Sequence, residues 1–309
     1  MQRILFFTLF LFTSTFVQAQ GAYQFLPPPG KTLLFIGQDK QTIDDYVKAT
    51  GVIPAGVMVY TSIQDVSGLS EAFDNGAGVH HGAYLMEQYP NSALQIGLYM
   101  VDATDRVNQG LHEQNIDILA EWIRAQARPV YLRIGYEFDN PDNHYEPGSY
   151  IRAYQRIVNR FRELEVDNVV FVWHSGAYIT EESDPMAWFP GDEYVDWIAA
   201  SFFAPVQYES VGRLASMARL WKKPFMIAEA SPMGTVSLEA KKDWYDKFFR
   251  TIADYEPSVA CYINSHWDAQ KMFKAERFGD ARVQKFVPIK ELWLKEISQE
   301  RYVHAQKDL

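Results

Sequence analysis

The stretch Pro129-Val-Tyr-Leu-Arg-Ile-Gly-Tyr-Glu-Phe-Asp139 joins an apolar run to a group of charged side chains. Its first half, Val130–Ile134, has the composition of a buried β-strand, in which successive side chains point to opposite faces. If that alternation continues, Arg133, Gly135 and Glu137 share one face. Charged groups at the end of a buried strand are costly unless an ion pair or a functional site uses them. The stretch therefore indicates either a structural ion pair or a site.

Short apolar runs similar to Val130–Ile134 recur along the whole sequence. Their starts are 24 to 39 residues apart, which leaves room for a loop and a helix each time. Nearly continuous apolar strands are expected in a parallel sheet that is covered on both faces. The eight predicted strands are Thr32–Ile36, Gly56–Tyr60, Leu94–Leu98, Val130–Ile134, Val169–Trp173, Trp197–Ser201, Pro224–Ala228 and Val259–Ile263.

Several segments between these runs carry apolar residues at helical spacing. The clearest are residues 116–123, residues 150–161, Leu238–Tyr255 and Glu291–Ile297. Thr61–Asn91 is rich in Gly, Asp and His, and we expect a long loop there with at most one short helix. Eight strands that alternate with helices predict an α/β fold of a single domain, a closed (β/α)8 TIM barrel. A doubly wound open sheet is the alternative.

The first residues have the pattern of a secretory signal peptide. Met1-Gln-Arg3 is positively charged, Ile4–Phe16 is apolar apart from Thr and Ser, and Val17-Gln-Ala19 has small residues where a signal peptidase cleaves. We therefore predict a signal peptide over residues 1–19 and one catalytic domain over residues 20–309. The protein would be secreted or periplasmic, with no membrane anchor after cleavage. An uncleaved anchor is the alternative.

Composition narrows the possible partners. The net charge of −10, without a basic tail, disfavours nucleic acid and anionic membrane surfaces. Cys261 is the single cysteine and is expected to be a buried small apolar residue. Asp139–Asn143 superficially suggests a calcium loop, but Pro141 occupies a ligand position and no Gly stands at the turn. We predict no metal and no cofactor, and we expect a monomer.

The two glutamates that finish predicted strands are the main candidates for chemistry. In a (β/α)8 barrel the site lies at the carboxyl ends of the strands, where Glu137 follows the fourth strand and Glu229 the seventh. A retaining glycosidase needs two carboxyl groups about 5–5.5 Å apart, one as nucleophile and one as acid/base. A nearby cation such as Arg133 would keep the nucleophile ionised. Other candidates for orienting these groups or contacting sugar are Tyr136, Asp139, Trp173, His174, Phe203 and Trp267.

These residues resemble the retaining glycosidases of clan A, and most of all glycoside hydrolase family 26. The resemblance spans roughly residues 94 to 268 and implies that Glu137 is the acid/base and Glu229 the nucleophile. It also implies that Trp267 forms the floor of the cleavage subsite. Trp173 would hold a second sugar ring, and His174 would help Arg133 to orient the reacting groups. The matching stretches are Arg133-x-x-x-Glu137, Val172-Trp173, Phe189-Pro-Gly-Asp-Glu-Tyr-Val-Asp-Trp197 and Ile227-Ala-Glu-Ala-Ser231.

Three departures from the mannanases of that family bear on the substrate. Tyr136 stands where they carry His before the acid/base, and Asn140–Tyr145 replaces a Trp-rich loop. Ser201-Phe-Phe203 replaces an Asp-x-Tyr whose Tyr touches the nucleophile, and Tyr208 is the candidate replacement. We predict a retaining endo-β-glycanase that acts on a neutral β-linked polysaccharide, which is β-1,3-xylan, β-mannan or β-glucan. The alternative is a carbohydrate-binding barrel without catalysis.

Overall fold

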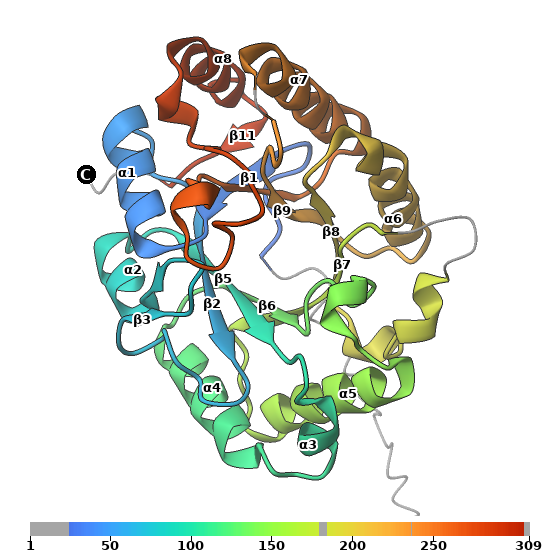
Figure 1. The fold of residues 1–309 in the computed structure, drawn as a ribbon. Helices are drawn as coiled ribbons and strands as arrows, with labels where there is room; N and C mark the ends of the chain where they lie inside the picture. The colour runs from blue at the N-terminus through green and yellow to red at the C-terminus, as the bar shows by residue number, and fades with distance from the viewer. Residues whose placement is uncertain (1–24, 179–183, 236, 306–309) are drawn as a thin grey trace, which may run out of the picture.

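Eight parallel strands form a closed barrel in the computed structural model, which describes residues 25–178, 184–235 and 237–305 (Figure 1). Each strand pairs with the next one along the chain, and β10 pairs with β1 to close the ring. The (β/α)8 prediction and all eight predicted strands are thereby confirmed, whereas the predicted signal peptide lies outside the described residues. The barrel strands are β1 (Thr32–Gly37), β2 (Gly56–Ser62), β5 (Ala93–Tyr99), β6 (Val130–Ile134), β7 (Val169–Ser175), β8 (Trp197–Phe202), β9 (Phe225–Ala230) and β10 (Val259–Ile263).

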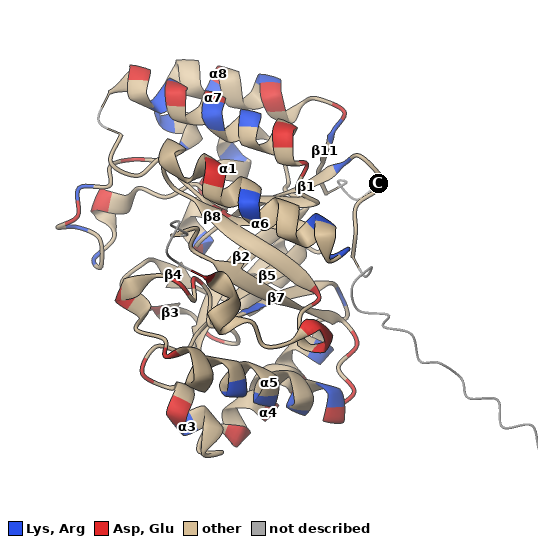
Figure 2. Ribbon diagram, turned by 90° about the vertical axis from the view of Figure 1, so that its right-hand side faces the viewer, with Lys and Arg blue, Asp and Glu red and all other residues tan. Residues whose placement is uncertain are grey.

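Helices surround the barrel and connect its strands (Figure 1). Charged side chains lie on these helices and on the loops, whereas the barrel strands are largely uncharged (Figure 2). The four predicted helical segments are confirmed as α4, α5, α7 and α8. The helices of the described chain are α1 (Lys40–Thr50), α2 (Gly82–Gln88), α3 (Thr104–Asn108), α4 (Glu113–Ala125), α5 (Pro147–Glu163), α6 (Tyr208–Leu220), α7 (Leu238–Tyr255) and α8 (Val287–Ile297).

Short elements complete the loops. The predicted long loop over residues 61–91 holds one short helix, α2, as expected, and also an antiparallel hairpin that its sequence did not indicate. Two-residue strands are too short to show a period. The short strands are β3 (Phe73–Asp74), β4 (Val79–His80) and β11 (Tyr302–Val303), and the 3-10 turns are η1 (Pro141–Asn143), η2 (Pro185–Trp188), η3 (Asp192–Tyr194), η4 (Pro205–Gln207), η5 (Trp267–Ala269) and η6 (Val283–Lys285).

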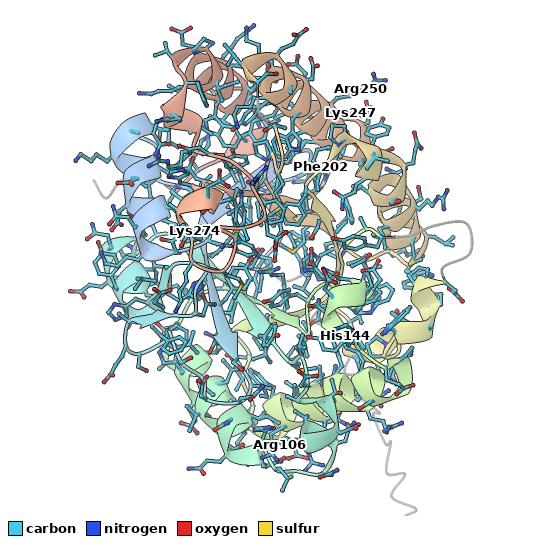
Figure 3. All side chains as sticks on the ribbon, viewed as in Figure 1. Arg106, His144, Phe202, Lys247, Arg250 and Lys274 are labelled. Carbon is cyan, nitrogen blue, oxygen red and sulfur yellow. The ribbon has the colours of Figure 1, made fainter. Side chains whose placement is uncertain are left out.

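Strand alternation divides the apolar side chains into two cores. One core fills the barrel interior and the other lies between the strands and the helices. Side chains occupy the interior throughout (Figure 3). At its centre the Tyr131 ring meets Phe35 and Trp197 edge to face, at centroid distances of 5.3 and 5.1 Å. Cys261 is fully buried in this interior core, as expected.

Phe25 covers part of the amino end of the barrel. The hydroxyl of Tyr131 donates to the carbonyl of Phe25 at 2.6 Å, and the Phe25 ring packs against the Tyr131 ring. At the carboxyl end, two backbone hydrogen bonds join the loops on one side of the mouth. Met272 N donates to Gly76 O at 2.8 Å and Gly234 N to Phe278 O at 3.0 Å.

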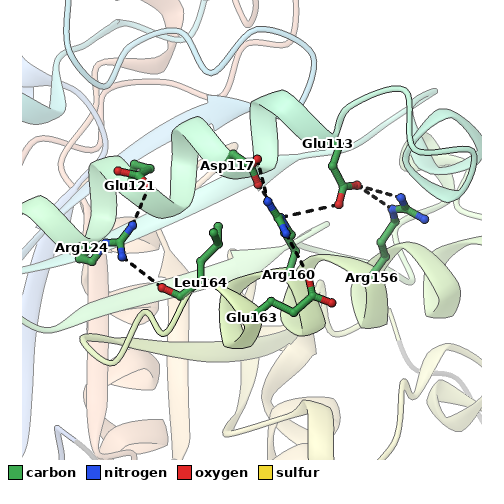
Figure 4. Close-up of polar contacts among 8 residues, drawn as sticks. All are labelled: Glu113, Asp117, Glu121, Arg124, Arg156, Arg160, Glu163 and Leu164. Carbon is green, nitrogen blue, oxygen red and sulfur yellow. Dashed lines mark hydrogen bonds and ion pairs between the residues drawn. The ribbon is translucent and has the colours of Figure 1, made fainter.

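Ion pairs hold together the two helices outside β6 (Figure 4). Arg160 on α5 donates to both carboxylate oxygens of Asp117 on α4, at 2.6 and 2.9 Å. Arg156 donates to Glu113 through two nitrogens, at 3.0 and 2.9 Å. Single exposed pairs contribute at most about 1 kcal/mol, so this network supports the position of the helices rather than the barrel itself.

A glycine in β5 makes room beneath the site. A Cβ at Gly97 would lie 2.6 Å from Tyr60 Cδ1 and 2.8 Å from Arg133 Nη2. We expect Gly97→Ala to lower the free energy of unfolding by about 1–3 kcal/mol, measured by urea unfolding, because the interior is already filled. The matched control is Gly148→Ala in the first turn of α5, where the nearest atom is Arg152 Nη1 at 3.4 Å. A Gly97 variant as stable as this control would contradict the close packing.

Candidate active site

The carboxyl end of β6 turns sharply instead of continuing as a strand. The strand ends at Ile134, and both Gly135 (φ 55°) and Glu137 (φ 52°) have left-handed backbone. The prediction that Arg133, Gly135 and Glu137 share one strand face is therefore wrong, because alternation holds only in extended chain. A glutamate in this conformation is strained, which is typical of functional sites. The side chain of Asn143 fixes the turn by donating to the Glu137 carbonyl at 2.9 Å.

An irregularity in the β8–β9 ladder directs Glu229 toward the interior. Ala200 pairs with Ile227, but the next residue, Ser201, pairs with Glu229, so β9 contains one extra residue. Ile227 faces the helices, and strict alternation would place Glu229 on that same outer face. Bulges of this kind often lie next to active sites and reorient a side chain. Here the bulge places Glu229 in the mouth of the barrel.

Glu229 forms an ion pair with an arginine buried in the barrel. Arg133 Nη1 donates to Glu229 Oε1 and lies 3.2 Å from His174 Nδ1. The guanidinium carbon also lies 5.0 and 5.1 Å from the ring centroids of Tyr60 and Tyr136. Burial alone would lower the pKa of Arg133, but the neighbouring Tyr60 and Glu229 raise it overall. Arg133 is therefore a permanent cation beneath the site.

The environment of Glu137 differs from that of Glu229, although both side chains are buried. Its Oε1 accepts from the Ser201 hydroxyl at 2.7 Å and its Oε2 from Asn140 Nδ2 at 3.0 Å. Burial raises the pKa of Glu137 to about 7, and the charge of Glu229 contributes, while both hydrogen bonds oppose the rise. Glu137 can thus hold a proton near neutral pH, while Glu229 is paired with Arg133. An acid and a nucleophile require such a division.

His174 connects the surroundings of the two carboxyls. It is fully buried, with Nε2 3.0 Å from the Ser201 oxygen. Burial lowers the pKa of His174 well below its usual value, and the charge of Arg133 lowers it further. The ring is therefore neutral, and because it is covered it can act only by holding its neighbours.

Trp173 does not lie in the cleft, contrary to the prediction that it holds a sugar ring. Its side chain is 0% exposed and stacks on Phe138 with a centroid distance of 4.5 Å. Its Nε1 donates to the carbonyl of Trp188 at 3.2 Å. The reason is alternation in β7, which turns His174 inward and its predecessor outward toward the helices.

Tyr208 is also misplaced in the prediction, since it does not replace the tyrosine expected near Glu229. It begins α6, donates to Asp254 Oδ2 on α7 at 2.5 Å and packs against the Tyr255 ring at a centroid distance of 5.0 Å. Tyr60, near the carboxyl end of β2, lies close to Glu229 instead. Burial raises the pKa of Tyr60 well above its usual value, with Glu229 adding to the rise and Arg133 opposing it.

The other predicted residues lie around the mouth in different roles. Both carboxylate oxygens of Asp139 are used within the protein, since they accept from Ser175 Oγ at 2.6 Å and from Gly176 N at 2.6 Å. Asp139 thus braces the loop after β6 against β7. Trp267 is buried over the interior core, with Nε1 donating to Ser231 Oγ at 2.8 Å. Phe203 is half-buried on the same core, and Tyr136 is half-buried beside Arg133.

Four residues of the site were missed by the sequence analysis: Tyr60, Asn140, Tyr178 and Ser201. Tyr60 could have been found, because it is the inward residue at the end of the second predicted strand. Tyr178 is 46% exposed, and its ring lies where a side chain at Gly176 would be, next to Glu137. Burial raises the pKa of its hydroxyl to about 12, with Glu137 contributing.

Within the described ranges, no three His, Cys, Asp or Glu side chains are grouped to hold a metal ion.

Comparison with known proteins places this chain in a family. The model of Glycosyl hydrolase family 26 matches residues 37–277. Beta-1,3-xylanase TXYA from Vibrio sp. is 34% identical over 315 residues, which cover 92% of this chain and 68% of that protein. A beta-1,3-xylanase from Alcaligenes sp. is 32% identical over 314 residues, covering 92% and 67%. A GH26 beta-mannanase from Bacteroides ovatus has the same fold, with a TM-score of 0.69 at 13% identity and coverage of 91% and 92%.

The raised pKa of Glu137 has a consequence for stability that needs no substrate. Between pH 4.5 and about 7 the folded chain keeps the Glu137 proton while the unfolded chain releases it. The contribution of Glu137 to the free energy of unfolding is therefore fully present below pH 4.5 and is lost as the pH rises to about 7. We expect the stability of Glu137→Gln relative to the wild type to rise over this range, by on the order of 2–3 kcal/mol.

Urea unfolding at several pH values between 4 and 8 measures this difference. Other titrating groups, such as the buried Asp39, are common to both proteins and cancel. Glu239→Gln, on the exposed start of α7, is the matched control and should show a flat difference. A flat difference for Glu137→Gln as well would contradict the raised pKa.

Proposed function

Because the chain belongs to glycosyl hydrolase family 26 and is a glycoside hydrolase, we propose that it is a retaining endo-β-1,3-xylanase. The observation that carries the mechanism is the unequal environment of its two carboxyls, an arginine-paired Glu229 and a protonatable Glu137. The 34% and 32% identities to two beta-1,3-xylanases support the substrate. The positions that differ from the mannanases, Tyr136 and Ser201-Phe-Phe203, agree with a substrate other than β-mannan.

In the first step, Glu229 attacks the anomeric carbon while Glu137 gives its proton to the leaving oxygen. A covalent glycosyl-enzyme results, and the charge of Glu229 is consumed. The pKa of Glu137 then falls, because the neighbouring negative charge that helped to raise it has gone. Glu137 can therefore take a proton from water in the second step, which releases the sugar with its original anomeric configuration.

Substrate contacts are assigned to the side chains that remain accessible at the mouth. Tyr178 and Tyr136 lie next to Glu137, and Phe203 is half-buried on the interior core, whereas the buried Trp267 can only support the floor from beneath. Aromatic faces suit sugar rings, since they provide apolar area without competing for the hydroxyl groups. We also propose that the chain is exported and acts as a monomer. The signal pattern of residues 1–19 supports export, and no helix in the described chain is long and apolar enough to cross a membrane.

The activity is tested with β-1,3-xylan, β-mannan and mixed-linkage β-glucan. We expect the wild type to release a ladder of short oligosaccharides from β-1,3-xylan, with proton NMR showing the β-anomer first. Glu229→Ala should lose more than about 10⁴-fold in kcat, because no other group can form the covalent intermediate. Glu239→Ala, on an exposed helix, is the control and should retain full activity. Cleavage of another glycan but not of β-1,3-xylan would show that the proposed substrate is wrong. Binding without cleavage would favour a non-catalytic barrel.

The pH dependence tests the assignment of Glu137 as the acid. The free enzyme must hold a proton on Glu137, so kcat/KM on β-1,3-xylan should fall as pH rises through about 7. This alkaline limb should disappear with an aryl glycoside whose phenol leaves without protonation. A limb that persists with such a substrate would mean that a different group titrates.

A further inference from the structure

A continuous chain of hydrogen bonds joins the two catalytic carboxyls beneath the floor of the site. It runs from Glu229 through Arg133, His174 and Ser201 to Glu137. Arg133, His174 and Ser201 are each 0% exposed, so the chain is sealed from solvent. The inference drawn from it rests on the proposed roles of Glu137 and Glu229, and it concerns the position of the catalytic proton.

The direction of each hydrogen bond follows from the chemistry of the groups. An arginine has only donors, so His174 Nδ1, 3.2 Å from Arg133 Nη1, must be the acceptor. The neutral ring then carries its hydrogen on Nε2, which donates to the Ser201 oxygen at 3.0 Å. Ser201 has one hydrogen, and among the described residues its remaining partner is Glu137 Oε1 at 2.7 Å. The hydroxyl therefore donates to Glu137.

We propose that His174 and Ser201 are positioning residues that keep the catalytic proton of Glu137 out of the buried contact between Oε1 and Ser201. A proton in that contact would face the Ser201 hydrogen, just as a proton between Oε2 and Asn140 would face an amide hydrogen. Each oxygen accepts with one lone pair, so the carboxyl hydrogen lies outside both contacts and is free for the leaving group. The permanent charge of Arg133 thus ensures, through two neutral side chains, that Ser201 donates to Glu137 and does not take its proton.

The same chain affects how readily Glu137 ionises. Ser201 and Asn140 both donate to Glu137, and donors stabilise the ionised carboxylate. Two negative charges oppose these donors and raise the pKa of Glu137, namely Glu229 on β9 and Asp139 in the same loop as Glu137. The phenols of Tyr136, Tyr145 and Tyr178 also face it, and their raised pKa values keep them neutral at working pH. Ser201 is therefore the element of the chain whose loss should alter the titration most directly.

Direct titration of Glu137 tests the proposal without any substrate. Glutamate is labelled with ¹³C at its carboxyl carbon, and the Glu137 signal is identified by its absence from Glu137→Gln. We expect Ser201→Ala to raise the midpoint by roughly one pH unit, because a donor to the carboxylate is lost. Ser201→Thr keeps a hydroxyl and should restore the wild-type midpoint. Ser92→Ala should leave it unchanged, since Ser92 is equally buried but donates to the carbonyl of Pro54 at 2.7 Å.

A second variant tests the direction of the chain. His174→Asn keeps an acceptor for Arg133 but removes the Nε2 donor, so Ser201 becomes free to accept the Glu137 proton. Acceptance stabilises the protonated carboxyl, and the midpoint should rise although Ser201 is intact. A residue that only supports the packing would not move it. Wild-type midpoints in the folded Ser201→Ala and His174→Asn proteins would overturn the proposal.

Kinetics separate this proposal from the proposed function. If β-1,3-xylan is the substrate, the alkaline limb of kcat/KM should move upward in Ser201→Ala by the same amount as the NMR midpoint. If no glycan is cleaved but the NMR midpoint still moves, the proposed function fails while the hydrogen-bond chain stands. If xylan is cleaved but both midpoints stay at the wild-type value, the proposed function stands and the chain is refuted.

Discussion

The buried cation of Arg133 is the constraint on which the rest of the site depends. Taking a guanidinium out of water costs several kcal/mol unless every neighbour compensates. Here a carboxylate, an imidazole and two aromatic rings compensate, supplied by β9, β7, β2 and the turn after β6. The glycine in β5 leaves the space that the guanidinium needs. Five strands are therefore arranged around one charge.

That single charge also makes the two carboxyls unequal. Glu229 has the cation as a direct partner, whereas Glu137 receives only neutral donors and lies within reach of the negative charge of Glu229. Both are nearly covered from solvent, so burial alone would treat them alike. The position of the arginine therefore gives the two carboxyls different partners, which is the asymmetry that the proposed acid and nucleophile would need.

The sequence was sufficient for the barrel and for the three charged residues at its centre, because buried parallel strands form continuous apolar runs and an isolated charge in such a run is conspicuous. The sequence was insufficient wherever a shift of one position along a strand changes whether a side chain points into the barrel or toward the helices. Trp173 was assigned to the cleft although its neighbour His174 takes the inward position. Glu229 reaches the site only through a bulge, which leaves no mark in the apolar pattern. The prediction that Tyr208 lies beside Glu229 was wrong, because the path of the chain after β8 is set by tertiary contacts such as the hydrogen bond from Tyr208 to Asp254.

The bracing of the loops has a mechanical consequence. On one side of the mouth the loops after β2, β9 and β10 are tied by backbone hydrogen bonds, and on the other side Asp139 ties the loop after β6 to the end of β7. Glu229 belongs to the first unit and Glu137 to the second. Any spreading or closing of the two units changes the gap between the carboxyls, which decides the stereochemical outcome of hydrolysis. If Glu229 and Glu137 act as proposed, the stereochemistry of hydrolysis depends on the stiffness of these two units as well as on residue identity.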